Sequence, residues 1–209
     1  MLQFITTVSS RFSVPEEVQM VLEGGCRWIQ LAQNGFAGDE SARRDVAMEI
    51  VPMCQEKEAF FIIEDDLDLV EEMKVHGLFM HDNSRASVMA ARERLGANAV
   101  IGVGAHSYDE IKNLAGLDVD YVTVPAPEER ADRDAFYKDL AQKLIADNIS
   151  FHIVAAGDFT SDSLVELFKA GVAGVAMSGE LVGQEDPVAA TVAVLDGLGK
   201  ARAAADASM

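Results

Sequence analysis

The chain repeats one pattern eight times: a short apolar, β-branched run, then a polar turn, then a longer stretch whose apolar residues have helical spacing. Most of these runs are continuously apolar and do not alternate with polar residues. A strand of that kind is buried on both faces, as in a parallel sheet covered by helices. The pattern therefore predicts eight strand–helix units, with strands at residues 4–8, 28–31, 60–63, 77–80, 100–103, 120–124, 151–155 and 174–177.

Eight such units favour closure into a (β/α)8 TIM barrel, although 209 residues is short for that fold. An open, doubly wound sheet is the alternative. That fold usually carries a glycine-rich turn after its first strand, whereas residues 9–13 here read Ser-Ser-Arg-Phe-Ser. We therefore expect a single TIM-barrel domain over residues 1–209, in which the first strand lies beside the eighth.

The charge balance is strongly acidic, with 17 Lys and Arg against 35 Asp and Glu and a formal net charge of -18. The sequence has no basic run, so a nucleic-acid partner is not expected. It also has no uninterrupted apolar run of about 20 residues and no basic leader, so neither a membrane span nor export is expected. Two cysteines, Cys26 and Cys54, are too few for a disulfide framework. These features predict a cytoplasmic protein with reduced thiols, and homo-oligomer formation stays open.

In a barrel of this kind the active site forms at the carboxyl ends of the strands. Two turns there have the character of phosphate sites: Gly157 precedes a helix that we expect near Thr160, and Met177 and Ser178 follow the last strand. Backbone N–H groups at such turns bind anions without a charged side chain. The remaining strand-end residues include acids and histidines but no lysine or arginine: Thr7, Ser9, Gln30, Ala32, Asn34, Glu64, Asp65, Asp66, His81, Asp82, Asn83, Gly104, His106, Thr123, Pro125, Asp158 and Gly179.

Several of these segments, in this order, resemble the thiamine phosphate synthase and thiazole tautomerase family. The resemblance covers residues 4–195, and its most specific stretches are the turn at His106 and the segment 170–178. It implies a compact (β/α)8 barrel. It also implies either a synthase, which joins a hydroxymethylpyrimidine diphosphate to a thiazole phosphate with Mg²⁺ and releases pyrophosphate, or a metal-free tautomerase that isomerises a thiazole carboxylate phosphate.

The resemblance also implies roles for individual residues. Asp65 matches a metal-binding aspartate, and Asp82 matches the second one if it has shifted from the position that Ser84 now holds. The predicted site therefore has Asp65 and His106 as catalytic residues and Asp65 and Asp82 as ligands of a weakly bound Mg²⁺. Its predicted contacts with a phosphorylated small-molecule substrate are Gln30, Asn34, Gly104, Gly157, Met177 and Ser178.

The cations of the family pattern are missing. The family has Gln-Leu-Arg-x-Lys after the second strand and Asn-Asp-Arg after the third, whereas this chain has Ala32, Asn34 and Asp66 where those cations stand. Two negative charges about 4 Å apart repel by roughly 4 kcal/mol at an effective dielectric constant near 20, so acids without cations hold a diphosphate poorly. Lys138 and Arg130 are the only nearby candidates to replace the missing lysine.

Structural roles compete with these functional ones. Asp65 and Asp66 stand where a helix begins and are equally suited to capping it. His106 fits a structural role in its turn, and His81 fits either an exposed loop residue or a general base. Three functions stay open: a synthase, a family barrel that has become an isomerase or small-molecule binder, and a partner-binding scaffold.

Overall fold

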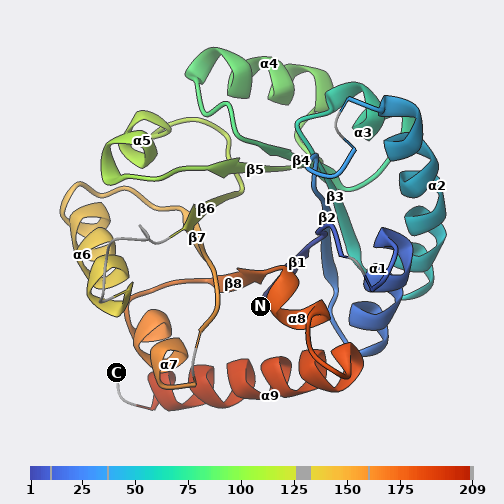
Figure 1. The fold of residues 1–209 in the computed structure, drawn as a ribbon. Helices are drawn as coiled ribbons and strands as arrows, with labels where there is room; N and C mark the ends of the chain where they lie inside the picture. Colours follow the sequence, from blue (N-terminus) through green and yellow to red (C-terminus); the bar gives the residue numbers. More distant parts are fainter. Residues whose placement is uncertain (10, 37, 126–132, 160, 208–209) are drawn as a thin grey trace.

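The computed structural model describes residues 1–209 except 10, 37, 126–132, 160 and 208–209. Its strands form one closed parallel barrel in which each strand pairs with its neighbours in sequence, and β1 pairs with β8 (Figure 1). The predicted eight-stranded barrel is therefore confirmed, and so is the pairing of the first strand with the last. The strands are β1 Leu2–Ile5, β2 Trp28–Leu31, β3 Phe60–Glu64, β4 Gly77–Met80, β5 Val100–Gly104, β6 Tyr121–Pro125, β7 His152–Ala156 and β8 Gly174–Met177.

Helices surround the barrel as an outer layer, and the long last helix runs beside α7 and α1 (Figure 1). Among the described residues no helix is long and apolar enough to cross a membrane. The helices are α1 Val14–Glu23, α2 Glu40–Glu56, α3 Leu67–Met73, α4 Arg85–Leu95, α5 Tyr108–Asn113, α6 Arg133–Ala146, α7 Ser161–Lys169, α8 Gly179–Val182 and α9 Pro187–Asp206.

The first strand begins and ends earlier than the predicted range 4–8, so that prediction was wrong in its boundaries. The register places Phe4 opposite Ile29 and Met177, which aligns residues 2–5 with the neighbouring strands. Thr6 still donates its N–H to Gln30 O, but its hydroxyl accepts the N–H of Ala32, and Val8 is 68% exposed. The β-branched residues 6–8 therefore belong to the first loop at the barrel mouth.

The apolar core has two parts because successive strand residues point to opposite faces. The larger part fills the space between strands and helices and includes both cysteines, which are free and buried as expected. The smaller part fills the barrel itself, with Ile62, Phe79, Tyr121, Val154 and Ala176. The Tyr121 ring lies inside the barrel beside Gly102, where an added Cβ would lie 2.1 Å from Tyr121 Cζ.

This close approach makes Gly102 a test of the interior packing. We expect Gly102→Ala to destabilise the protein by about 1–3 kcal/mol or more, because the Tyr121 ring is buried and has no room to move aside. Urea unfolding measures the change. The control is Gly199→Ala in α9, where nothing lies within 4 Å of the added Cβ, and a gain of about 0.5–1 kcal/mol is expected from helix propensity. Equal stability of Gly102→Ala and the wild type would contradict this packing.

A buried carboxyl group lies beneath the first loop. Glu17 of α1 is fully buried and accepts the N–H of Thr7 at 3.3 Å, and its Oε1 atom has no partner among the described residues. Burial raises the pKa of Glu17 to about 7, which the Thr7 hydrogen bond only partly opposes. Between about pH 4.5 and 7 the folded protein therefore binds a proton that the unfolded chain has released, so stability falls as pH rises through that window.

Replacing this carboxyl group with an amide tests how much the ionisation of Glu17 destabilises the folded protein. We expect Glu17→Gln to be more stable than the wild type at pH 8, on the order of 2–3 kcal/mol, and nearly equal to it at pH 5. Denaturant unfolding at both pH values measures the difference. Glu23→Gln, an exposed change on the same helix, should show no such dependence on pH. A constant difference between Glu17→Gln and the wild type at both pH values would be evidence against the shifted carboxyl.

Candidate active site

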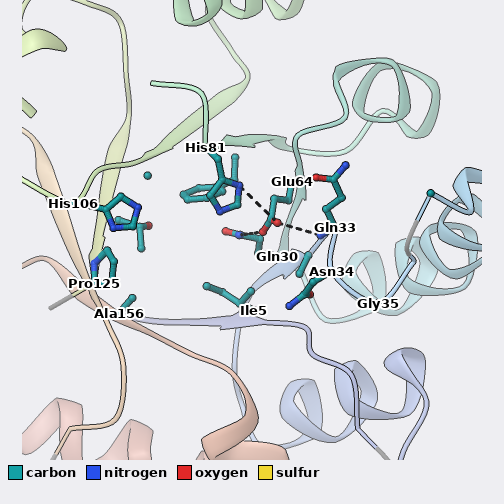
Figure 2. Close-up of a pocket in the computed structure, with 15 residues that line it drawn as sticks. Ile5, Gln30, Gln33, Asn34, Gly35, Glu64, His81, His106, Pro125 and Ala156 are labelled. Atoms are coloured by element: carbon teal, nitrogen blue, oxygen red, sulfur yellow. Dashed lines mark hydrogen bonds and ion pairs between the residues drawn. The ribbon is translucent and has the colours of Figure 1, made fainter. Parts of the chain in front are cut away.

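A cavity of about 660 Å³ opens at the carboxyl ends of the strands (Figure 2). Four predicted site residues line it: Gln30, Asn34, Gly104 and His106. In Figure 2 the side chains of His81 and His106 lie on the side of β4 and β5, while Glu64, Gln30 and Gln33 lie together. The other lining residues are Ile5, Ala32, Gly35, Gly38, Phe79, Thr123, Pro125 and Ala156.

A buried chain of side-chain hydrogen bonds leads from the barrel interior to the Glu64 carboxylate at this cavity. Gln3 Nε2 donates to Tyr121 Oη at 3.1 Å and to Gln30 Oε1 at 3.0 Å. Gln30 Nε2 in turn donates to Glu64 Oε2 at 2.8 Å, and the Gln33 N–H donates to Glu64 Oε1 at 3.1 Å. These bonds fix the Gln30 amide and hold the Glu64 carboxylate at the cavity wall.

Glu64, Asp65 and His81 meet beside the cavity. His81 Nδ1 lies 2.7 Å from Asp65 Oδ2 and 3.8 Å from Glu64 Oε1, and the His81 N–H donates to Asp65 Oδ1 at 2.9 Å. Consecutive residues of a strand normally face opposite ways. Asp65 has a φ of 49°, in the left-handed region that few non-glycine residues adopt, and this turn of the backbone brings its carboxylate next to that of Glu64.

The structure separates the two acids that compete for the helix cap. Asp66 Oδ1 accepts the N–H of Leu69 and caps α3, whereas Asp65 bonds to His81. Arg43 of α2 fastens the same corner: its guanidinium donates to Leu31 O and Glu64 O and lies 3.6 Å from Asp66. Arg43 is buried, and its side chain is absent from the cavity lining. It therefore stabilises the ends of β2 and β3.

Asp82 lies away from this cluster. Both of its carboxylate oxygens accept hydrogen bonds at the start of α4, from Ser87 Oγ at 2.5 Å and from the Ser84 N–H at 3.0 Å. The Ser87 hydroxyl, followed by the Ser84 bonds, holds the pKa of Asp82 below its usual value. In this arrangement Asp82 bonds to the start of α4, and it is not part of the group formed by Glu64, Asp65 and His81.

The predicted phosphate turns also lie outside the lining of the main cavity. Gly157 follows β7 with a φ of 141°, and the Ser178 N–H donates to Glu180 Oε2 at 2.9 Å, so a carboxylate of the chain already takes that donor. Met177 is buried and lines an adjacent cavity of about 400 Å³. Four acids line that second cavity: Asp158, Glu180, Glu185 and Asp186.

Among the residues that the structure describes, no lysine or arginine lines the main cavity. Lys138 lies on α6, and its charge lowers the pKa of Glu166 on α7 after the stronger effect of Lys169. Arg130 lies outside the described residues. Besides Arg43, the structure brings Arg133, the first residue of α6, to a strand end, where its Nη1 donates to Asp158 O at 3.1 Å beside Gly157. Sequence reasoning missed Arg133 because it is distant in sequence from Gly157 and no motif connects the two.

The fold and the cavity define a (β/α)8 barrel with an open cavity at the carboxyl ends of its strands, where barrels of this fold form their active sites. A sequence profile described as thiamine monophosphate synthase matches residues 2–181, so the chain belongs to that family.

Individual relatives agree with this assignment. Thiamine-phosphate synthases are 29% identical over 203 residues in Bacteroides thetaiotaomicron and 30% identical over 203 residues in Phocaeicola vulgatus, each match spanning 93% of this chain and 96% of the relative. The solved structure of a thiamine phosphate pyrophosphorylase from Pyrococcus furiosus superposes with a TM-score of 0.79 at 21% identity, over 96% of both chains. At that identity the structural match shows the shared fold.

Substitution of Glu180 tests whether the Ser178 N–H can bind an anion. We expect Glu180→Ala to bind inorganic phosphate about threefold or more tightly than the wild type, because it frees the Ser178 N–H and removes a negative charge. Glu185→Ala removes a charge from the same cavity without freeing that donor, and serves as the control. NMR shifts of the Ser178 amide during a phosphate titration measure both. If the two variants bind phosphate equally, the Ser178 N–H is not an anion donor.

Proposed function

We propose that the protein couples a hydroxymethylpyrimidine diphosphate to a thiazole phosphate and releases pyrophosphate. The family match over residues 2–181 carries this proposal. It is supported by a cavity at the strand ends in which Gln30, Asn34, Gly104 and His106 line one space. In this reaction the bond between the pyrimidine methylene carbon and the diphosphate oxygen breaks, pyrophosphate leaves with the electron pair, and the thiazole nitrogen attacks the carbon.

Gln30 is proposed to orient the pyrimidine. Its amide already uses one hydrogen on Glu64 and one lone pair on Gln3, which leaves the second hydrogen and the second lone pair for a ligand. A pyrimidine edge with neighbouring donors and acceptors matches such an amide. His106 and Asn34 are proposed to contact the substrate from other parts of the cavity lining.

Mg²⁺ is part of the proposal only as a weakly bound ion. Of the two predicted ligands, Asp65 lies beside the cavity and accepts two bonds from His81, and Asp82 bonds to α4. Mg²⁺ prefers oxygen ligands in a near-octahedral arrangement, usually one or two carboxylates with substrate phosphates. The residues present do not supply the two-carboxylate pair that the family resemblance implies, so no step of the proposed reaction runs through Mg²⁺.

The missing cations limit the rate of this reaction. Charge develops on the departing pyrophosphate, so positive groups at that point act most strongly in the transition state. Ala32 and Asn34 stand where the family places Arg and Lys. Losing one such donor costs about 3 kcal/mol, or roughly a hundredfold in rate. Because the losses fall in one cluster, they do not add simply.

We therefore expect thiamine phosphate to form at least about a hundredfold more slowly than in a family member that carries the Arg and Lys. The assay incubates both substrates with Mg²⁺ and follows the product by its fluorescence after oxidation. The double variant Ala32→Arg, Asn34→Lys restores both charges and should be faster than the wild type. Wild-type turnover equal to that of the cation-bearing relative would show that another group, such as Arg133, replaces them.

A thiazole tautomerase-like isomerase is the second candidate function. The observation that favours it is the composition of the cavity wall: two imidazoles, of His81 and His106, and no lysine or arginine among the described lining residues. Imidazole accepts and donates protons near neutral pH. An isomerisation releases no pyrophosphate, so it does not need cations to stabilise a leaving group. The same protein preparation distinguishes the two candidates, because isomerisation of a thiazole carboxylate phosphate proceeds without the pyrimidine diphosphate.

A further inference from the structure

We propose that Glu64, Asp65 and His81 form a binding site for a divalent first-row transition-metal ion, with Mn²⁺ as the test ion, in place of a two-carboxylate magnesium site. One carboxylate oxygen from each acid and Nδ1 of His81 all lie within 4.8 Å of one another. No ion is needed to bring these atoms together, because the backbone does so.

The backbone conformation of Asp65 is the first support. Its left-handed φ of 49° reverses the alternation of side chains at the end of β3, so that two consecutive carboxylates approach one imidazole. Such conformations cost of order 1–3 kcal/mol and cluster at functional sites, and in this chain Glu58, Lys74 and Asn148 adopt one as well. Asp66 makes the N-cap bond of α3, so that bond does not use the Asp65 side chain. The carboxylate of Asp65 is therefore left to His81.

The charge of Glu64 is the second support. Its side chain is buried, and among the described residues its oxygens accept hydrogen bonds from the neutral donors Gln30 Nε2 and the Gln33 N–H, while Oε1 lies 3.8 Å from His81 Nδ1, itself one of the three proposed ligands. Arg43 contacts the backbone carbonyl of Glu64 and pairs with the Asp66 carboxylate. Buried charges in proteins are paired or bind metals. A divalent cation between Glu64 and Asp65 would balance both carboxylates.

The cavity itself is the third support, because it contains a buried polar atom that lacks a partner. Thr123 at the end of β6 is 5% exposed, lines the same cavity, and its Oγ1 makes no hydrogen bond among the described residues. An oxygen-rich ligand in this cavity would accept a hydrogen bond from Thr123. The same ligand would complete the coordination of an ion that three protein groups hold only in part.

The donor set indicates the class of ion. Mg²⁺ and Ca²⁺ favour oxygen ligands, whereas imidazole suits the first-row transition ions, and two carboxylates with one imidazole suit Mn²⁺ or Zn²⁺ better than Mg²⁺. We therefore expect these three groups to bind Mg²⁺ more weakly than Mn²⁺ or Zn²⁺.

The test is a titration of the metal-free protein with Mn²⁺, in the absence of any substrate, followed by electron paramagnetic resonance of the free ion. We expect one Mn²⁺ per chain, displaced by Mg²⁺ only at a large excess. His81→Gln should weaken Mn²⁺ at least tenfold and change the affinity for Mg²⁺ less than twofold. Asp65→Asn should also weaken Mn²⁺, and asparagine tolerates the left-handed backbone at that position.

The control is His152→Gln, which removes an exposed imidazole at the start of β7, far from the strand ends that form the cavity. It should bind Mn²⁺ like the wild type. Absence of Mn²⁺ binding to the wild type, or equal Mn²⁺ affinity of His81→Gln and the wild type, would overturn the proposal. Because no substrate is present, either result leaves the proposed coupling reaction to be judged by its own assay.

Discussion

Closure of the sheet, through the parallel pairing of β1 with β8, is the constraint on which the site depends. In a closed parallel barrel every strand ends at the same rim, so residues that are tens of positions apart in sequence meet there without any local signal for contact. Glu64 and Gln30 are 34 residues apart, and Gln3 and Tyr121 are 118 apart, yet one chain of hydrogen bonds connects them. The interior of the barrel thus supports the floor of the cavity.

Most of the fold was readable from the sequence because buried parallel strands are continuously apolar. The run 77–80 was predicted with its observed bounds for that reason, since it is buried at every position. Residues 6–8 were misassigned because β-branched side chains favour extended backbone whether or not a neighbouring strand is available to pair with it. Where β1 ends is decided by its register with β2 and β8, which a local pattern does not contain.

The site was harder to predict from the sequence, because one polar side chain can bond to several different partners. From the sequence, Asp65 and Asp66 fitted a helix cap and a metal ligand equally well, and only the structure gives the cap to Asp66 and the contact with His81 to Asp65. Asp82 was predicted to face a metal, and its serine neighbours offered closer donors. The absence of cations at positions 32, 34 and 66, by contrast, was visible in the sequence, whereas the approach of Arg133 to Gly157 was visible only in the structure.

The chain of amides in the barrel also has a direction. Gln3 donates to Tyr121 and Gln30, and Gln30 donates to Glu64, whose carboxylate only accepts. Turning the Gln30 amide over would set its oxygen against a Glu64 oxygen and its NH2 group against that of Gln3. The hydrogen-bonding polarity at the floor of the cavity is therefore set by the Glu64 carboxylate at one end of the chain, and a ligand that binds Gln30 meets a surface whose donor and acceptor sides are already decided.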